Sequence, residues 1–306
     1  MEAYNIMLVF TSFIQGIKNV WSNKFLIGIM FFFKFGFSLI LLAPFYLMFS
    51  ASFGANAKAS SLILGLDFSL LVDFVYHWRQ TLSIYFLMFL LVSFLAIMVF
   101  VFFSGGFWGV LKDQSRGKEK DLKTARFFEC CAKYFWGMFR IALLLVAFYL
   151  IAFFLFLFLT SIFDSVAGKE SWFELTSWRI IIKVLIFVFL FFLVNMTGDY
   201  LRVFHIQDFK ERFSVFVKKT FRFLLTNFFK TLSLYYLLSF VLILAILAYF
   251  GVDKVMERIP KTSFYVLLVF LFQQISSLIR AFYRLVYYSS QIALVDKVLE
   301  KKDHLK

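Results

Sequence analysis

The sequence of 306 residues is poor in cysteine, proline and charge. It holds two Cys, two Pro and 13 Gly, and 16% of its residues are charged. Cys130 and Cys131 are adjacent and have no partner elsewhere, so the chain offers neither a disulfide framework nor the ligand spacing of a zinc site. We interpret both as small, reduced, apolar residues of an amphipathic helix.

The common enzyme motifs are also missing. The chain has no P-loop, no dinucleotide-binding fingerprint, no HExxH and no Ser-His-Asp arrangement. Its three histidines are scattered, and His205 and Asp208 have no third metal ligand near them in the sequence. We therefore expect no catalytic residue, no metal site and no cofactor, and interpret the protein as not being an enzyme.

Apolar residues are abundant instead. The chain is 62% hydrophobic and 23% aromatic, with 49 Phe and a mean hydropathy of +0.87. A water-soluble protein is about half apolar, because it must cover its core with polar surface. The excess predicts lipid as the solvent, and with no Pro- or Gly-rich linker we expect one integral membrane domain over residues 1–306.

Six nearly uncharged segments are long enough to cross the hydrocarbon core of a bilayer, which takes about 20 residues of helix. The fold class expected is therefore all-α, a polytopic membrane protein. We expect the fourth and sixth segments, which are short, to continue as helix beyond the bilayer. The six spans are 26–49, 82–103, 141–163, 180–194, 231–250 and 263–279.

The distribution of charge predicts the orientation. Of the 32 Lys and Arg, 23 lie before the first span, between spans two and three, between spans four and five, or after the sixth; seven lie in the other three loops. The positive-inside rule then places both termini in the cytoplasm and the protein in the cytoplasmic (inner) membrane. The net charge of +14 favours anionic lipid headgroups as partners and not nucleic acid, since it lies beside the spans.

A stretch with helical amphipathic spacing precedes each odd-numbered span. We expect these three stretches to lie in the membrane plane at the cytoplasmic face, as anchors of the spans or as lipid sensors. With the spans they predict three helix-pair repeats, at 5–113, 122–206 and 208–299. Their apolar faces are Ile6, Val9, Phe10, Phe13, Ile17, Val20 and Trp21; Phe127, Phe128, Cys131, Tyr134 and Phe135; and Phe209, Phe213, Phe216, Val217, Phe221 and Leu224.

The even-numbered spans end alike, as Gly106-Phe107-Trp108, Gly198-Asp199-Tyr200 and Ala281-Phe282-Tyr283. In this pattern the chain resembles a group of bacterial six-span proteins that is similar to the membrane portion of membrane-anchored glycerophosphodiester phosphodiesterases. The resemblance implies a fold and no activity, because no soluble segment is long enough for the catalytic barrel of those enzymes. Gly105 and Gly109 have the GxxxG spacing that allows close helix contact, which we expect within the monomer.

Five polar residues in the spans form the candidate site: Lys34, Asn195, Asp199, Gln273 and Gln274. A charge as deep as Lys34 suggests a functional role, although a lysine can also extend its side chain to the interface. With Asp199 as counter-ion of Lys34, the five could line a pocket open to the cytoplasm. Hydrogen bonding between helices is the alternative explanation for such residues.

Two functions follow from this pattern. The favoured one is a non-enzymatic membrane protein that interacts with lipid or serves as a scaffold for an unidentified membrane-protein partner. The alternative is a small transporter or permease that uses the polar pocket, because transporters often contain internal repeats and polar groups near the midplane.

Overall fold

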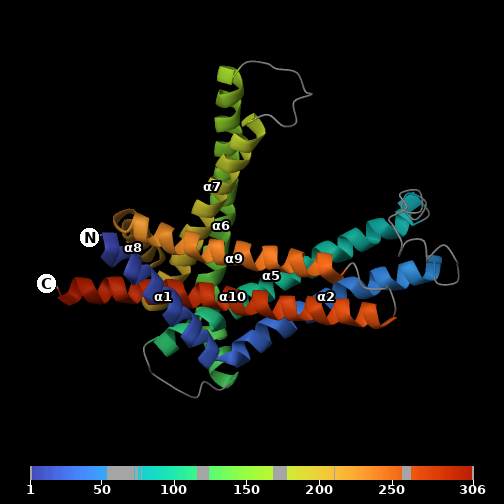
Figure 1. Cartoon of the computed structure of the whole chain (residues 1–306), viewed down its shortest axis with the longest axis horizontal. Helices are drawn as coiled ribbons and strands as arrows, with labels where there is room; N and C mark the ends of the chain where they lie inside the picture. Colours follow the sequence, from blue (N-terminus) through green and yellow to red (C-terminus); the bar gives the residue numbers. More distant parts are fainter. Residues whose placement is uncertain are drawn as a thin grey trace. The chain divides into compact units, whose positions relative to one another are not determined.

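The structure is a computed structural model that describes residues 2–53, 72, 75–76, 78–115, 124–167, 178–209, 211–256 and 263–304. All regular secondary structure in these ranges is helical, which confirms the all-α class (Figure 1). The helices are α1 (Glu2–Ser22), α2 (Lys24–Phe53), α5 (Arg79–Ser115), α6 (Thr124–Ala167), α7 (Trp178–Gln207), α8 (Phe213–Thr226), α9 (Phe228–Met256) and α10 (Ser263–His304).

Five of the described helices are long and apolar enough to cross a membrane: Lys24–Pro44, Arg79–Ser115, Thr124–Ser165, Ile180–Gln207 and Phe228–Met256. At most 22% of the apolar window in any of them is buried inside the protein. Large side chains such as Phe32, Leu87 and Phe154 are 65–70% exposed, which water would penalise and lipid tails would not. The helices are those of a multi-pass integral membrane protein.

The sixth expected span, 263–279, forms the first part of α10. It is not among the five candidate spans found in the described residues, so six crossings remain a prediction. The expected helical continuations are confirmed, since α7 runs to Gln207 and α10 to His304.

The chain divides into two compact units, Met1–Ile27 with Val101–Lys306, and Gly28–Phe100. The second unit contains most of α2 and the first part of α5. There the Tyr85 hydroxyl donates a hydrogen bond to the Pro44 carbonyl at 3.3 Å. The rings of Phe33 and Phe100 stack with their centroids 6.4 Å apart. The single domain expected from the sequence remains a prediction.

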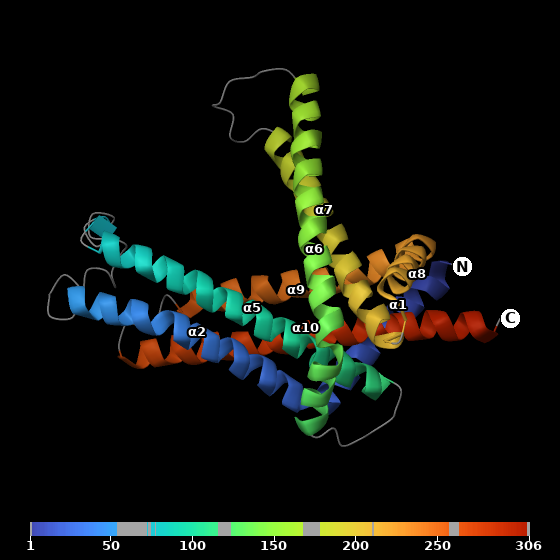
Figure 2. The ribbon, with the colours of Figure 1, turned by 180° about the vertical axis from the view of Figure 1, so that it is seen from behind.

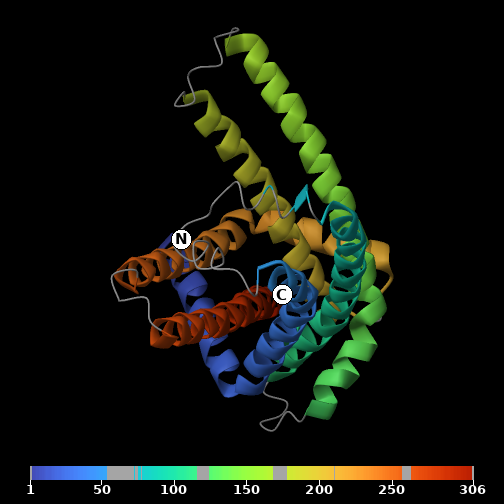
Figure 3. The same cartoon turned by 90° about the vertical axis from the view of Figure 1, so that its right-hand side faces the viewer.

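The core of the first unit consists of the last turns of α5 and α7 and the middle of α10. These segments bury Trp108, Tyr200 and Tyr288, and the rings of Trp108 and Tyr288 stack at 4.4 Å. Helix α1 crosses α10 and packs against it (Figure 1), and α6 runs beside α7 (Figures 2 and 3). Helix α8 packs against α7 and α9.

Small residues allow α5 and α6 to approach closely. A Cβ atom on Gly106 would lie 2.5 Å from the sulfur of Cys131, and one on Gly109 would lie 2.9 Å from Cβ of Cys130. Both cysteines are buried and free. The close helix contact predicted from the glycine spacing is therefore found within the monomer.

The three stretches expected to be amphipathic are helical, as α1, the first turns of α6, and α8. Their apolar residues face two environments. In α1, Val9 and Val20 are buried while Phe10 and Trp21 are more than half exposed. One apolar face therefore packs on the protein while other apolar side chains stay open to the surroundings.

Candidate functional site

Asp199 is the most deeply buried of the sequence-predicted site residues, with 3% of its surface exposed. It lies on α7, where Arg202 follows one turn later on the same face. The Arg202 guanidinium contacts the carboxylate with an N···O distance of 2.7 Å. The side-chain amide of Gln291, on α10, approaches the other carboxylate oxygen at 3.4 Å. The charge of Asp199 is thus compensated, and its carboxylate connects α7 to α10.

Aromatic hydroxyls and a second arginine surround this ion pair. The Arg284 guanidinium lies over the ring of Tyr288, 5.2 Å from its centroid, and its Nε donates to the Tyr288 hydroxyl at 2.9 Å. Asp199 lies near the Arg284 guanidinium and near the phenols of Tyr200, Tyr235 and Tyr287. We call the set Asp199, Arg202, Arg284, Gln291, Tyr200, Tyr235 and Tyr287 the Asp199 cluster.

Asn195 lies one turn before Asp199 and extends the cluster towards α6. Its carbonyl oxygen accepts a hydrogen bond from the Tyr149 hydroxyl at 2.8 Å, and its amide donates to the Phe191 carbonyl at 2.9 Å. Tyr149 also lies near Asp199 and Arg202. Asn195 therefore joins α6 to α7.

The buried atoms of the cluster that have no hydrogen-bond partner within the described ranges include the Tyr200 hydroxyl and Oε1 of Gln291. Buried polar atoms are nearly always paired, with protein or with ordered water. We expect ordered water beside these two atoms.

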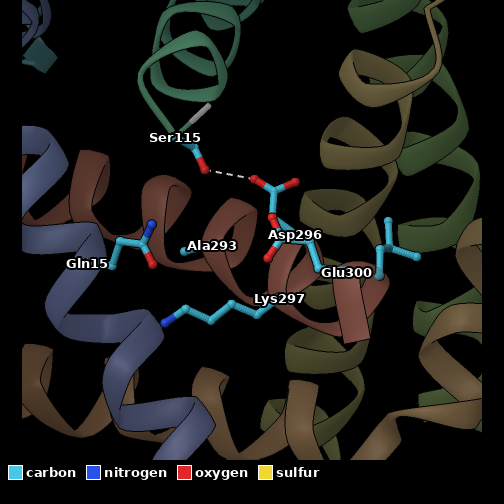
Figure 4. A pocket seen from close by; sticks show the side chains of 7 residues that line it. Gln15, Ser115, Ala293, Asp296, Lys297 and Glu300 are labelled. Atoms are coloured by element: carbon cyan, nitrogen blue, oxygen red, sulfur yellow. Dashed lines mark hydrogen bonds between the residues drawn. The ribbon is translucent and has the colours of Figure 1, made fainter. Parts of the chain in front are cut away.

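A second carboxylate joins three helices further along α10. Asp296 accepts a hydrogen bond from the Ser115 hydroxyl of α5 at 2.7 Å (Figure 4). It accepts another from the Gln207 side-chain amide of α7 at 2.8 Å. The buried Lys112 of α5 donates to the carbonyl of Ile206 on α7. The ends of α5 and α7 are thus fastened to each other and to α10 by polar groups.

A polar cavity of about 360 Å³ lies beside Asp296. Burial lowers the pKa of the Lys297 ammonium, and the negative charge of Glu300 partly opposes that effect. The cavity thus combines an amine with carboxylates and could hold a small polar solute. Its lining residues are Gln15, Ser115, Ala293, Asp296, Lys297, Leu299 and Glu300 (Figure 4).

The structure brings together two of the five sequence-predicted residues. Asn195 and Asp199 share one stretch of α7, whereas Gln273 and Gln274 lie elsewhere on α10. The α10 residue that reaches Asp199 is Gln291, and at the rise of an α-helix Gln274 lies roughly 25 Å from it. Gln273 is exposed and Gln274 half-buried.

Lys34 lies on α2 in the second unit and is half-buried. Asp199 belongs to the first unit, where Arg202 is its ion-pair partner. The pairing of Lys34 with Asp199 remains a prediction.

Sequence reasoning missed most of the residues of the Asp199 cluster and the partners of Asp296. The Asp199–Arg202 pair had a detectable signal, because opposite charges three apart in an apolar segment indicate a local ion pair. Asp296 had no such signal, since its partners Ser115 and Gln207 come from helices distant in the sequence.

The arrangement is suited to fastening helices together. Both carboxylates already accept hydrogen bonds, and their partners come from α5, α7 and α10. In the part of the chain that the structure describes, no group of three or more His, Cys, Asp or Glu side chains could hold a metal ion. No protein-family model, curated protein or solved structure matches the chain.

Proposed function

We propose that the protein is a non-enzymatic, six-span protein of the cytoplasmic membrane that binds anionic lipid headgroups at the cytoplasmic face. Both termini lie in the cytoplasm. Three in-plane amphipathic helices, each ahead of a helix pair, contact the headgroups, and the bundle serves as a lipid-binding or scaffold subunit. We propose that the resemblance to the membrane portion of the phosphodiesterases concerns the fold and not the activity.

The surface of α8 supports this proposal best. The helix buries one face against the protein, through Phe216, Thr220, Phe223 and Leu224. Its other side exposes the basic residues Lys218, Lys219 and Arg222 next to the apolar side chains of Val215, Phe221 and Leu225. An exposed face that mixes basic with apolar residues is typical of a helix at a membrane interface.

Lys219 differs from its two basic neighbours. It forms ion pairs with Glu211 and with Asp208, which lies 3.2 Å away. The hydrogen bond to Glu211 raises the pKa of the Lys219 ammonium above its ordinary value. Lys218 and Arg222 are therefore the α8 cations we assign to headgroups, at about 1 kcal/mol for each residue near an anionic surface.

The proposal is tested in nanodiscs of neutral or anionic phospholipid. A ligand that binds the folded state raises the unfolding temperature, so we expect wild-type protein to unfold at a higher temperature in anionic discs than in neutral ones. The double variant Lys218→Glu, Arg222→Glu should lose this difference, and high salt should weaken it in the wild type.

The matched control is Lys254→Glu, at the far end of α9, where the residue is exposed. We expect this variant to keep the wild-type response to anionic lipid. An anionic-lipid response that survives in the double variant would refute headgroup binding by α8.

The polar cavity beside Asp296 favours the second candidate function, a small transporter. A transporter must open its site to each side of the membrane in turn. Leu299→Cys places a thiol in the cavity, while the native cysteines are buried. Labelling of that thiol by an impermeant reagent from both sides would support transport, and labelling from the cytoplasmic side alone would support the lipid-binding protein.

A further inference from the structure

We propose that a groove between α6 and α7 binds one acyl chain of an anionic phospholipid whose headgroup contacts Lys218 and Arg222 of α8. This inference rests on the proposed function and identifies the ligand and the site. Its residues all belong to the first unit of the chain.

The groove is apolar almost throughout. It has a volume of about 230 Å³, and its lining is Phe148, Ile151, Ala152, Leu155, Leu190, Leu193, Val194, Thr197 and Phe221. The one hydroxyl in this set, on Thr197, already donates to the Leu193 carbonyl at 2.8 Å. An occupant of the groove therefore finds no free hydroxyl proton there, and the lining favours an apolar occupant.

The shape of the groove matches a chain rather than a compact ligand. On α6 it extends from Phe148 to Leu155, and on α7 from Leu190 to Thr197. Each stretch spans seven residue steps, or roughly 10 Å at the rise of an α-helix. The groove is thus a furrow that follows the helix pair, and in the proposed spans α6 and α7 it would run along the lipid tails.

Phe221 connects the groove to the basic surface of α8. Its ring meets the ring of Phe148 edge to face at 6.1 Å, so α8 lies at the Phe148 end of the groove. Lys218 lies one turn before Phe221 on the same side of the helix, and Arg222 follows it directly. Both basic side chains are exposed. A lipid whose tail fills the groove therefore has its phosphate beside two cations.

Charge selects the phospholipid among apolar occupants. A transmembrane helix of a partner or of a second copy could cover the apolar furrow but would leave Lys218 and Arg222 without a counter-ion. An anionic phospholipid satisfies both parts, because its tail is apolar and its phosphate pairs with Lys and Arg.

The test is native mass spectrometry of the full chain in mild detergent, after incubation with phosphatidylglycerol or phosphatidylcholine. We expect one retained phosphatidylglycerol per chain and weaker retention of phosphatidylcholine. Ala152→Trp fills the groove and should abolish retention. Leu155→Trp, at a position already 42% exposed, does the same with little risk to folding. The control is Val146→Trp. Val146 lies on another face of α6 and is 57% exposed, so this variant should retain the lipid.

Charge reversal of Lys218 and Arg222 should weaken phosphatidylglycerol binding at least about tenfold, given the attraction of each cation to an anionic surface. If the tryptophan variants keep the lipid while charge reversal removes it, the groove is not the site, although headgroup binding by α8 stands. Equal retention of the two lipids, or a protein dimer that the tryptophan variants dissociate, also overturns the assignment. If the charge-reversed protein and the tryptophan variants all retain phosphatidylglycerol as the wild type does, the proposed function is overturned as well.

Discussion

At the scale of single residues, burial decides how much an ion pair matters. The side chain of Asp199 is 4% exposed and that of its partner Arg202 is 22% exposed, so removal of the arginine would leave a carboxylate away from water. Arg126 instead pairs with Asp113 and Glu129 near the surface, where water screens the charges. The two arginines provide a direct comparison of buried and exposed pairs.

We expect Arg202→Leu to lower the free energy of unfolding by about 3 kcal/mol, because an unpaired buried charge is costly. Arg126→Leu, which breaks an exposed pair, should cost less than about 1 kcal/mol. Denaturant unfolding in mild detergent, followed by tryptophan fluorescence, measures both changes. Equal losses would show that burial of Asp199 is not what makes its pairing important.

At the scale of helices, two glycines of similar sequence context have different surroundings. A Cβ atom on Gly16 of α1 would lie 2.9 Å from the backbone nitrogen of Ser290 on α10, whereas one on Gly28 of α2 would meet nothing within 4 Å. Close approach of α1 to α10 therefore depends on the missing side chain at Gly16. The Ser290 Oγ would lie closer still, but rotation of that side chain would not relieve the contact with the backbone nitrogen.

Substitution by alanine should have opposite effects at these two positions. Gly16→Ala is expected to destabilise the protein by about 1–3 kcal/mol through overpacking. Gly28→Ala should stabilise it by up to about 1 kcal/mol, because alanine favours helix over glycine. The unfolding temperatures of the purified variants give the signs, and a stabilised Gly16→Ala protein would contradict the tight α1–α10 crossing.

At the scale of the whole molecule, the apolar helices predict membrane crossings and the loop charges predict the orientation of the protein. Five described helices could cross a bilayer, and the excess of Lys and Arg in alternate loops predicts which loops face the cytoplasm. The Asp199 cluster and the contacts of Asp296 would then lie at the cytoplasmic side.

An epitope tag inserted at residue 118 tests this orientation. We expect an antibody to reach the tag only after the cells are permeabilised. A tag inserted near residue 258, between the fifth and sixth expected spans, should be reached in intact cells. Exposure of the residue 118 tag on intact cells would invert the orientation and remove α8 from the cytoplasmic headgroups.

The fold could be predicted to the extent that it depends on local periodicity. Runs of apolar residues marked the helices, and the two spans that looked short were correctly expected to continue, as α7 and α10 do. The site could be predicted only in part. Asn195 and Asp199 lie close together because they are one helical turn apart. The distance of Gln273 and Gln274 from them depends on helix packing, which local sequence does not determine.

Composition and spacing by themselves determined the all-α class and the membrane as the expected solvent, because helical periodicity and apolar content depend on residues within one or two turns. The glycine spacing permitted a close helix contact, but only the tertiary structure decided that Gly106 and Gly109 meet Cys131 and Cys130. Only the tertiary structure decided that Gln291 meets Asp199 and that Asp296 meets Ser115 and Gln207. Those contacts join residues between 89 and 181 positions apart. Their formation depends on how long helices pack side by side, and that packing is not encoded in any short stretch of the chain.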